Sequence, residues 1–110
     1  MKTLVKKRKP SDFFLSEKEH IENIKRKKPE LYKLLENPSP KARLAANIYR
    51  LRNAHKMTQK ELADKAGIGL KTFQRIETAQ PDSNPTLDAI AALSKALRVD
   101  IQELYEKLEI

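Results

Sequence analysis

The sequence predicts an all-α protein built around one small helical domain. No run in its 110 residues alternates apolar and polar side chains with period two, and the β-branched residues are scattered. Several short segments instead carry apolar residues at helical spacing, each behind an N-terminal capping signal. A chain of this length suffices for one domain with a modest core.

Two short helices are expected near the N-terminus. Ser16 opens a capping-box pattern, SEKE, that starts a polar helix ending at about Lys28. Pro29 can open the next helix, PELYKLLE. The NPSP stretch at residues 37–40 stops that helix, because its prolines and polar residues favour a turn.

Positive charge is concentrated in the first part of the chain. The net charge is +8, and residues 1–43 alone hold 13 Lys/Arg against 6 Asp/Glu, largely in KKRK at 6–9 and KRKK at 25–28. Two interpretations stay open for these runs: a solvated tail, or an arm that contacts a polyanion. We place the boundary between a helical, basic N-terminal extension and a second domain at NPSP, as residues 1–38 and 39–110.

Five short helices are expected within the second domain. Ser39 as N-cap, with a proline after it, starts the first helix, which runs to about Lys56. Thr58 with Glu61 forms a capping box that starts the next one. Gly67 suits the left-handed residue that ends this second helix.

Three more helices complete the expected domain. One runs over about residues 70–78, and another begins at Pro85 or Thr86. Asp100 with Glu103 resembles a further capping box, so we expect the last helix to begin there.

The two glycines of the chain both lie in AGIG at residues 66–69, between two helices of about eight residues. Such a pair crosses steeply, as in a helix-turn-helix. On the second helix Phe73, Ile76 and Glu77 share one face. The opposite face carries polar and basic residues, namely Lys71, Gln74, Arg75 and Thr78. Acids are absent from residues 66–76, as expected of a surface that meets phosphates.

Over about residues 44–105 the chain resembles the phage repressor and Cro-like, or Xre-type, helix-turn-helix regulators. The matching segments are LR (51–52), TQKELA (58–63), AGI (66–68), LKTFQRIE (70–77) and PTLDAIAALSKALRV (85–99). The resemblance implies a five-helix lambda-repressor-like DNA-binding domain. It also implies that the helix Leu70–Thr78 enters the major groove of double-stranded DNA.

The resemblance also assigns roles to single residues. Gln59 would bind a phosphate and brace the recognition helix, and Arg52 and Glu77 would form a partly buried ion pair. The expected DNA-contacting residues are Gln59, Lys60, Leu70, Lys71, Thr72, Gln74, Arg75 and Thr78.

Two positions depart from the family pattern. Leu70 replaces a polar residue, so it either touches a thymine methyl group or flanks the core. TAQ after Glu77 replaces the usual glycine turn, which leaves the phosphate contacts of that loop open.

Other classes of function have no support in the sequence. The chain has no cysteine, and His20 and His55 lack the spacing of metal ligands. No Ser/His/Asp or Cys/His set is present, so we expect neither an enzyme nor a cofactor. No apolar run could span a bilayer, and the basic start MKTLVKKRK leads into PSDFF rather than a signal peptide. We therefore expect a cytoplasmic protein without a membrane partner.

These observations predict a sequence-specific DNA-binding regulator of transcription. A repressor is expected, because no activation or ligand-sensing domain is recognisable. One alternative is the antitoxin of a toxin–antitoxin pair, which would bind its own operator and hold a cognate toxin. The short chain and its added segment favour that alternative, whereas the basic extension disfavours wrapping a basic RNase-type toxin. A second alternative is a protein-interaction module whose outer face no longer reads DNA.

We further expect a homodimer, because one recognition helix reads only a few base pairs. The last helix offers an apolar surface for pairing, made of Leu104, Tyr105, Leu108 and Ile110. The cluster at residues 13–15, FFL, is a second candidate for this surface. The alternative is that the leucines of the last helix only close the core.

Overall fold

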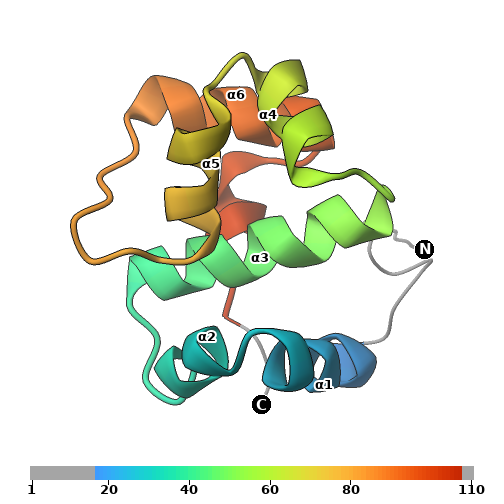
Figure 1. The fold of residues 1–110 in the computed structure, drawn as a ribbon, viewed down its shortest axis with the longest axis vertical. Coiled ribbons are helices and arrows are strands. Elements are labelled where there is room, and N and C mark those ends of the chain that lie inside the picture. The colour runs from blue at the N-terminus through green and yellow to red at the C-terminus, as the bar shows by residue number, and fades with distance from the viewer. Residues whose placement is uncertain (1–16, 108–110) are drawn as a thin grey trace, which may run out of the picture.

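A computed structural model describes residues 17–107, and every regular element in that range is helical (Figure 1). The elements are α1 (Glu17–Lys27), α2 (Pro29–Leu34), α3 (Pro40–Ala54), α4 (Gln59–Ala66), α5 (Leu70–Glu77), α6 (Leu87–Leu97) and the 3-10 helix η2 (Ile101–Tyr105). The predicted all-α fold is confirmed. The residues Ser16, Leu108, Ile110 and the FFL cluster, for which roles are predicted above, lie outside the described residues. Within residues 17–107 no helix is long and apolar enough to cross a membrane.

Short-range capping interactions fix where the helices begin and end. The Ser39 hydroxyl accepts a hydrogen bond from the Ala42 amide, 3.2 Å away, at the start of α3. Thr58 and Glu61 form both hydrogen bonds of a capping box at the start of α4. Gly67 ends α4 with φ +73°, a left-handed conformation that glycine adopts without steric cost. These caps satisfy backbone groups that a helix end leaves unpaired.

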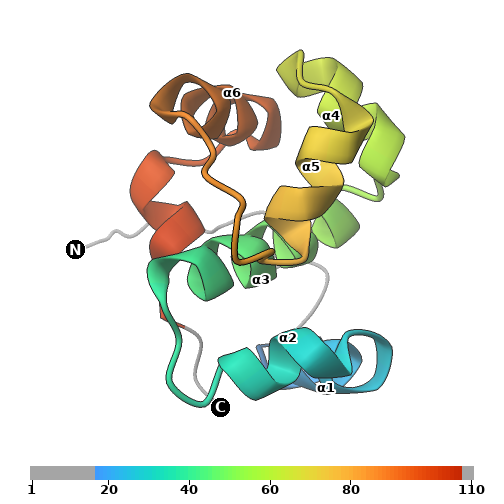
Figure 2. The same cartoon turned by 60° about the vertical axis from the view of Figure 1, so that its left-hand side comes forward.

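The main core lies between α3, α4, α5, α6 and η2 (Figure 2). Phe73 is its largest fully buried side chain and comes from α5. The other members with no exposed surface are Ile48, Leu51, Leu62, Ala63, Leu93, Leu97 and Leu104. Because all five helices contribute to one cluster, packing fixes the position of α5, whose N-cap Gly69 makes no side-chain capping bond.

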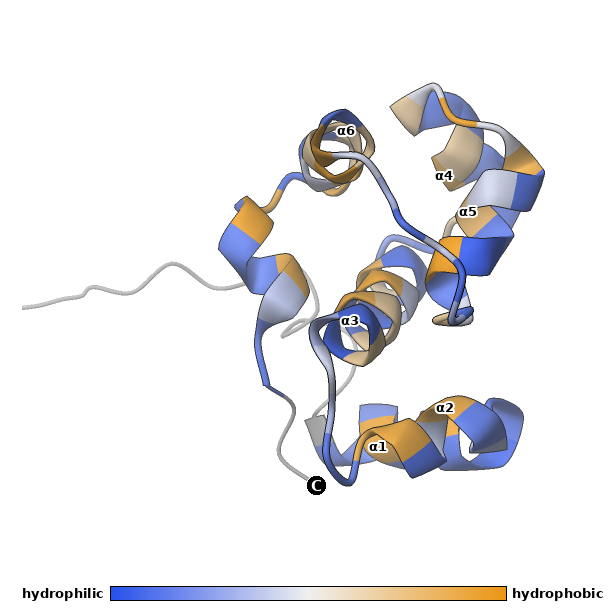
Figure 3. Ribbon diagram, turned by 90° about the vertical axis from the view of Figure 1, so that its left-hand side faces the viewer, coloured by the Kyte–Doolittle hydropathy of each residue, from blue (hydrophilic) through white to orange (hydrophobic). Residues whose placement is uncertain are grey.

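A second core holds the α1–α2 hairpin against α3. Ile21 and Ile24 of α1 and Leu31 of α2 are buried together with Ala46 and Tyr49 of α3. In Figure 3, α3 lies between this hairpin and the remaining helices. KRKK at 25–28 therefore belongs to a packed hairpin rather than to a disordered tail, with the side chains of residues 25–27 exposed, and KKRK at 6–9 lies outside the described residues. The domain boundary at NPSP stays a prediction.

The last element differs from the expected helix. Residues 101–105 form a 3-10 helix, and Asp100 makes no side-chain capping bond, so the predicted capping box with Glu103 is wrong. The buried amide of Asn47 donates to the carbonyls of Leu104 and Glu106, at 3.1 and 2.9 Å. These carbonyls thus pair with α3 instead of continuing a helical ladder.

The structure also places the residues expected to form the dimer surface. Leu104 has no exposed surface and closes the main core. Tyr105 is partly buried against the same core. Leu104 is therefore not available for pairing between protomers. This agrees with the alternative that the leucines of the last helix close the core.

His20 generates a prediction about pH. It is fully buried beside Tyr49, and burial, followed by the charge of Arg50, lowers its pKa from 6.5 to about 3. The unfolded chain therefore takes up this proton first as the pH falls, so stability is complete above about pH 6.5 and declines toward pH 3. Between pH 7 and pH 5 the loss is about 2 kcal/mol.

Urea unfolding of the wild type and of His20→Leu at both pH values measures this loss. The variant should lose most of the difference between pH 7 and pH 5. An unchanged difference in the variant would assign the pH dependence to other groups.

Candidate nucleic-acid interface

α5 presents one face to the core and the other to solvent. Phe73, Ile76 and Glu77 are buried. The exposed residues of this helix and its C-cap are Leu70, Lys71, Thr72, Gln74, Arg75 and Thr78. Leu70, at the start of the helix, is 37% exposed, so its side chain is partly accessible rather than part of the core. The two faces coincide with those expected from the sequence.

The carboxylate of Glu77 is surrounded by donors from other elements. Arg52 of α3 donates from Nε to Oε2 at 2.8 Å and from Nη2 to Oε1 at 3.2 Å. Gln59 of α4 donates from Nε2 to Oε1 at 2.7 Å. Lys28, between α1 and α2, places its Nζ 3.7 Å from the same oxygen. Glu77 has no exposed surface, so these donors compensate a charge that water cannot reach.

Arg52 connects this ion pair to the link between α3 and α4. Its Nη1 donates to the carbonyl of Met57, 2.9 Å away, in the segment that leads into α4. Its guanidinium also lies 5.5 Å from the ring centroid of Tyr49. One side chain thereby holds the ends of α3, α4 and α5 in a fixed relation.

Gln59 and Gln74 extend the cluster toward the surface. The side-chain oxygen of Gln59 accepts a hydrogen bond from Gln74 Nε2, 3.2 Å away. Gln59 therefore lies in a position to brace the recognition helix. Gln74 is exposed on the outward face of α5, as expected, and it also takes part in this bracing.

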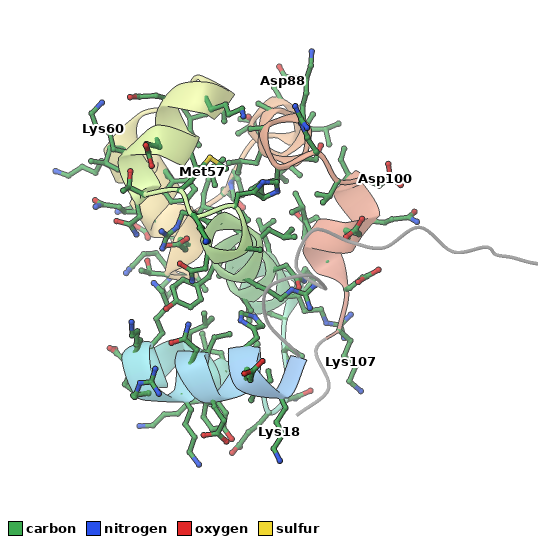
Figure 4. The ribbon with its side chains drawn as sticks, turned by 90° about the vertical axis from the view of Figure 1, so that its right-hand side faces the viewer. Lys18, Met57, Lys60, Asp88, Asp100 and Lys107 are labelled. Atoms are coloured by element: carbon green, nitrogen blue, oxygen red, sulfur yellow. The ribbon has the colours of Figure 1, made fainter. Side chains whose placement is uncertain are left out.

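The other residues expected to contact DNA differ in the hydrogen bonds and ion pairs that they form within the chain. Lys60 points away from α4 (Figure 4) and forms an exposed ion pair with Asp64, at 3.0 Å. The Thr78 hydroxyl donates to the carbonyl of Gln74 at 2.8 Å. Lys71 and Thr72 form no side-chain hydrogen bond or ion pair within residues 17–107.

Arg75 has a partner that the sequence reasoning did not anticipate. Its guanidinium forms an ion pair with Asp82 of the following loop, and this pair lowers the pKa of the Asp82 carboxyl. The side chains are 45% and 71% exposed, so water and salt screen the attraction. A phosphate or a guanine edge could therefore replace Asp82 at little cost. Only the closeness of Asp82 to Arg75 in the sequence could have indicated the pair.

The turn after α5 accommodates the missing glycine. Ala79 has φ +54°, in the left-handed region that a glycine would occupy without strain. Its side chain packs against the second core, which offsets part of the steric cost. The Gln80 side chain donates to the Thr78 hydroxyl at 3.4 Å.

The geometry of α4 and α5 defines a helix-turn-helix whose second helix is held by a buried ion pair and exposes a basic face. A family model described as helix-turn-helix matches residues 48–104, more than half of the chain. The chain belongs to this family, the Xre/Cro/C1-like group, and is in general terms a DNA-binding transcriptional regulator. No protein of curated function and no solved structure matches the chain.

The Glu77 cluster generates a prediction about stability. Arg52→Met removes two hydrogen bonds from a buried carboxylate and leaves its charge poorly compensated, which costs roughly 3 kcal/mol. Glu77→Gln should cost less, because the side chain keeps an acceptor for Gln59 and carries no buried charge. Chemical denaturation of both variants and the wild type measures the difference. A wild-type unfolding midpoint for Arg52→Met would contradict the role of the pair.

Proposed function

We propose that the protein is a repressor that binds a specific operator by placing α5 in the major groove. The observation that carries this proposal is the exposed, acid-free outer face of α5 on a helix fixed by the Glu77 cluster. A repressor of this kind needs only to occupy its operator, because occupancy excludes other proteins from the same DNA.

The side chains of this face suit both parts of DNA recognition. Arg75 has the forked guanidinium that pairs with the two acceptors of a guanine edge. Lys71 and Thr72 are exposed beside it, and Leu70 could contact the methyl group of a thymine. Lys60 would supply charge to a phosphate, which raises affinity for every sequence alike.

Arg75→Ala tests which face reads the bases. We expect specific binding to weaken by about 1–3 kcal/mol, with relaxed preference at one base pair. Lys60→Ala should weaken binding to all sequences equally. Affinities for a duplex selected by the wild type, and for its single-base variants, measure both effects.

Asp82→Asn is the matched control for that experiment. It removes the same intramolecular ion pair but keeps the guanidinium, so it should bind DNA at least as tightly as the wild type. Unchanged affinity and preference in Arg75→Ala would show that another face reads the operator.

We also propose that the protein binds a two-fold symmetric operator as a homodimer, with half-sites roughly 34–36 Å apart. Leu104 is buried, so another apolar residue must supply the contact. Ile101 of η2, 38% exposed, is the candidate on the same short helix.

Sedimentation at micromolar concentration should give a dimer for the wild type and a monomer for Ile101→Glu. Leu34→Glu, which places the charge on α2 instead, is the control and should stay dimeric. A monomeric wild type that binds its operator one to one would refute the proposal.

The antitoxin alternative uses the same DNA-binding face and would add a toxin contact on the α1–α2 hairpin. That hairpin exposes Leu34, which is 46% accessible, and it carries positive side chains at residues 25–27 beside the exposed acids Glu22, Glu30 and Glu36. We rank it second, because the run of three adjacent cations at residues 25–27 disfavours contact with a basic toxin at the turn. Growth arrest by the neighbouring reading frame, relieved by this protein, would reverse the order.

A further inference from the structure

We propose that the turn between α1 and α2 is a second DNA-contacting surface, which binds the phosphate backbone beside the base pairs read by α5. The basic turn is defined here as Lys25, Arg26, Lys27 and Lys28. This inference rests on the proposed function of α5 and adds a contact from outside the helix-turn-helix.

Three charges of the basic turn are weakly compensated within residues 17–107, whereas the fourth, that of Lys28, faces Glu77. Lys27 has no ion-pair or hydrogen-bond partner within residues 17–107. Arg26 makes one long hydrogen bond to Asn23, at 3.4 Å, and Lys25 lies over the Tyr32 ring, 5.6 Å from its centroid. Clustered cations repel one another, and an anion relieves that repulsion. A polyanion is therefore the partner that this surface fits.

The basic turn lies next to the C-terminal end of the recognition helix. Lys28 approaches Glu77 of α5 at 3.7 Å and lies over the Tyr49 ring, 4.9 Å from its centroid. Lys27 and Lys28, together with Glu30, line the same pocket as Thr78 and Gln80, which follow α5. In Figure 4 the end of the hairpin at which α1 turns into α2 lies below α4 and α5, on the side toward which Lys60 points. The basic turn thus borders the exposed C-terminal end of α5 at Thr78 and Gln80.

The hairpin holds this turn in a fixed position. Ile24 of α1 and Leu31 of α2, on either side of the turn, are buried against α3. Cations that are already positioned lose less conformational entropy on binding than cations on a flexible tail. With α5 in the major groove, an element beside its end lies over the backbone that borders the groove, where lysine and arginine meet phosphates.

The test compares two double variants of the full chain that each remove two positive charges. Arg26→Ala with Lys27→Ala removes two of the three exposed cations of the basic turn. Lys18→Ala with Lys107→Ala is the control, because both side chains are exposed and lie away from the Lys60 side in Figure 4. The probe is a duplex selected by the wild type from random sequences, titrated at several salt concentrations.

For the basic-turn variant we expect the slope of log affinity against log salt to fall by about 2 per bound protomer, with affinity roughly tenfold lower or more. Its preference for the selected duplex over a scrambled one should not change, because phosphates carry no sequence information. Shortening the flanks of the duplex should weaken the wild type but not this variant. Arg26→Lys with Lys27→Arg keeps both charges and should retain the wild-type slope.

A slope and flank dependence like those of the control would overturn the inference. Two further results separate the backbone contact of the basic turn from base reading by α5. A wild type without sequence preference whose slope still falls in the basic-turn variant would refute base reading by α5 and support the backbone contact. A wild type that binds no duplex would refute both.

Discussion

The buried carboxylate of Glu77 is the constraint on which the position of α5 depends. A charge without access to water is costly unless donors surround it, and here the donors are Arg52, Gln59 and Lys28. They come from α3, from α4 and from the link between α1 and α2. One carboxylate at the end of α5 therefore fixes three other elements relative to that helix.

This constraint also decides which side of α5 meets solvent. Phe73 and Ile76 enter the main core next to Glu77, so the helix cannot rotate without removing an aromatic ring from the core and a charge from its donors. Lys71 and Arg75 consequently stay exposed. A helix held in this way needs little rearrangement before it binds a partner.

The sequence predicted the features that depend on neighbouring residues and missed those that depend on distant ones. The cap at Thr58 and the left-handed Gly67 are local and could be found from spacing alone. The 3-10 helix η2 ends where the amide of Asn47, far away in the sequence, donates to the carbonyls of Leu104 and Glu106. The approach of Lys28 to Glu77 likewise depends on how the hairpin packs on α3, which no local pattern encodes.

Native-state hydrogen exchange on Glu77→Gln tests most directly whether this carboxylate holds the elements together. Leu93→Ala, which opens a cavity in α6 of the main core, is the comparison. We expect Glu77→Gln to reduce the protection of the amides of α5 and of residues 28–31 more than that of α6, and Leu93→Ala to affect α6 at least as strongly. The same loss at the same amides in both variants would contradict the account, because Glu77 would then contribute only to overall stability.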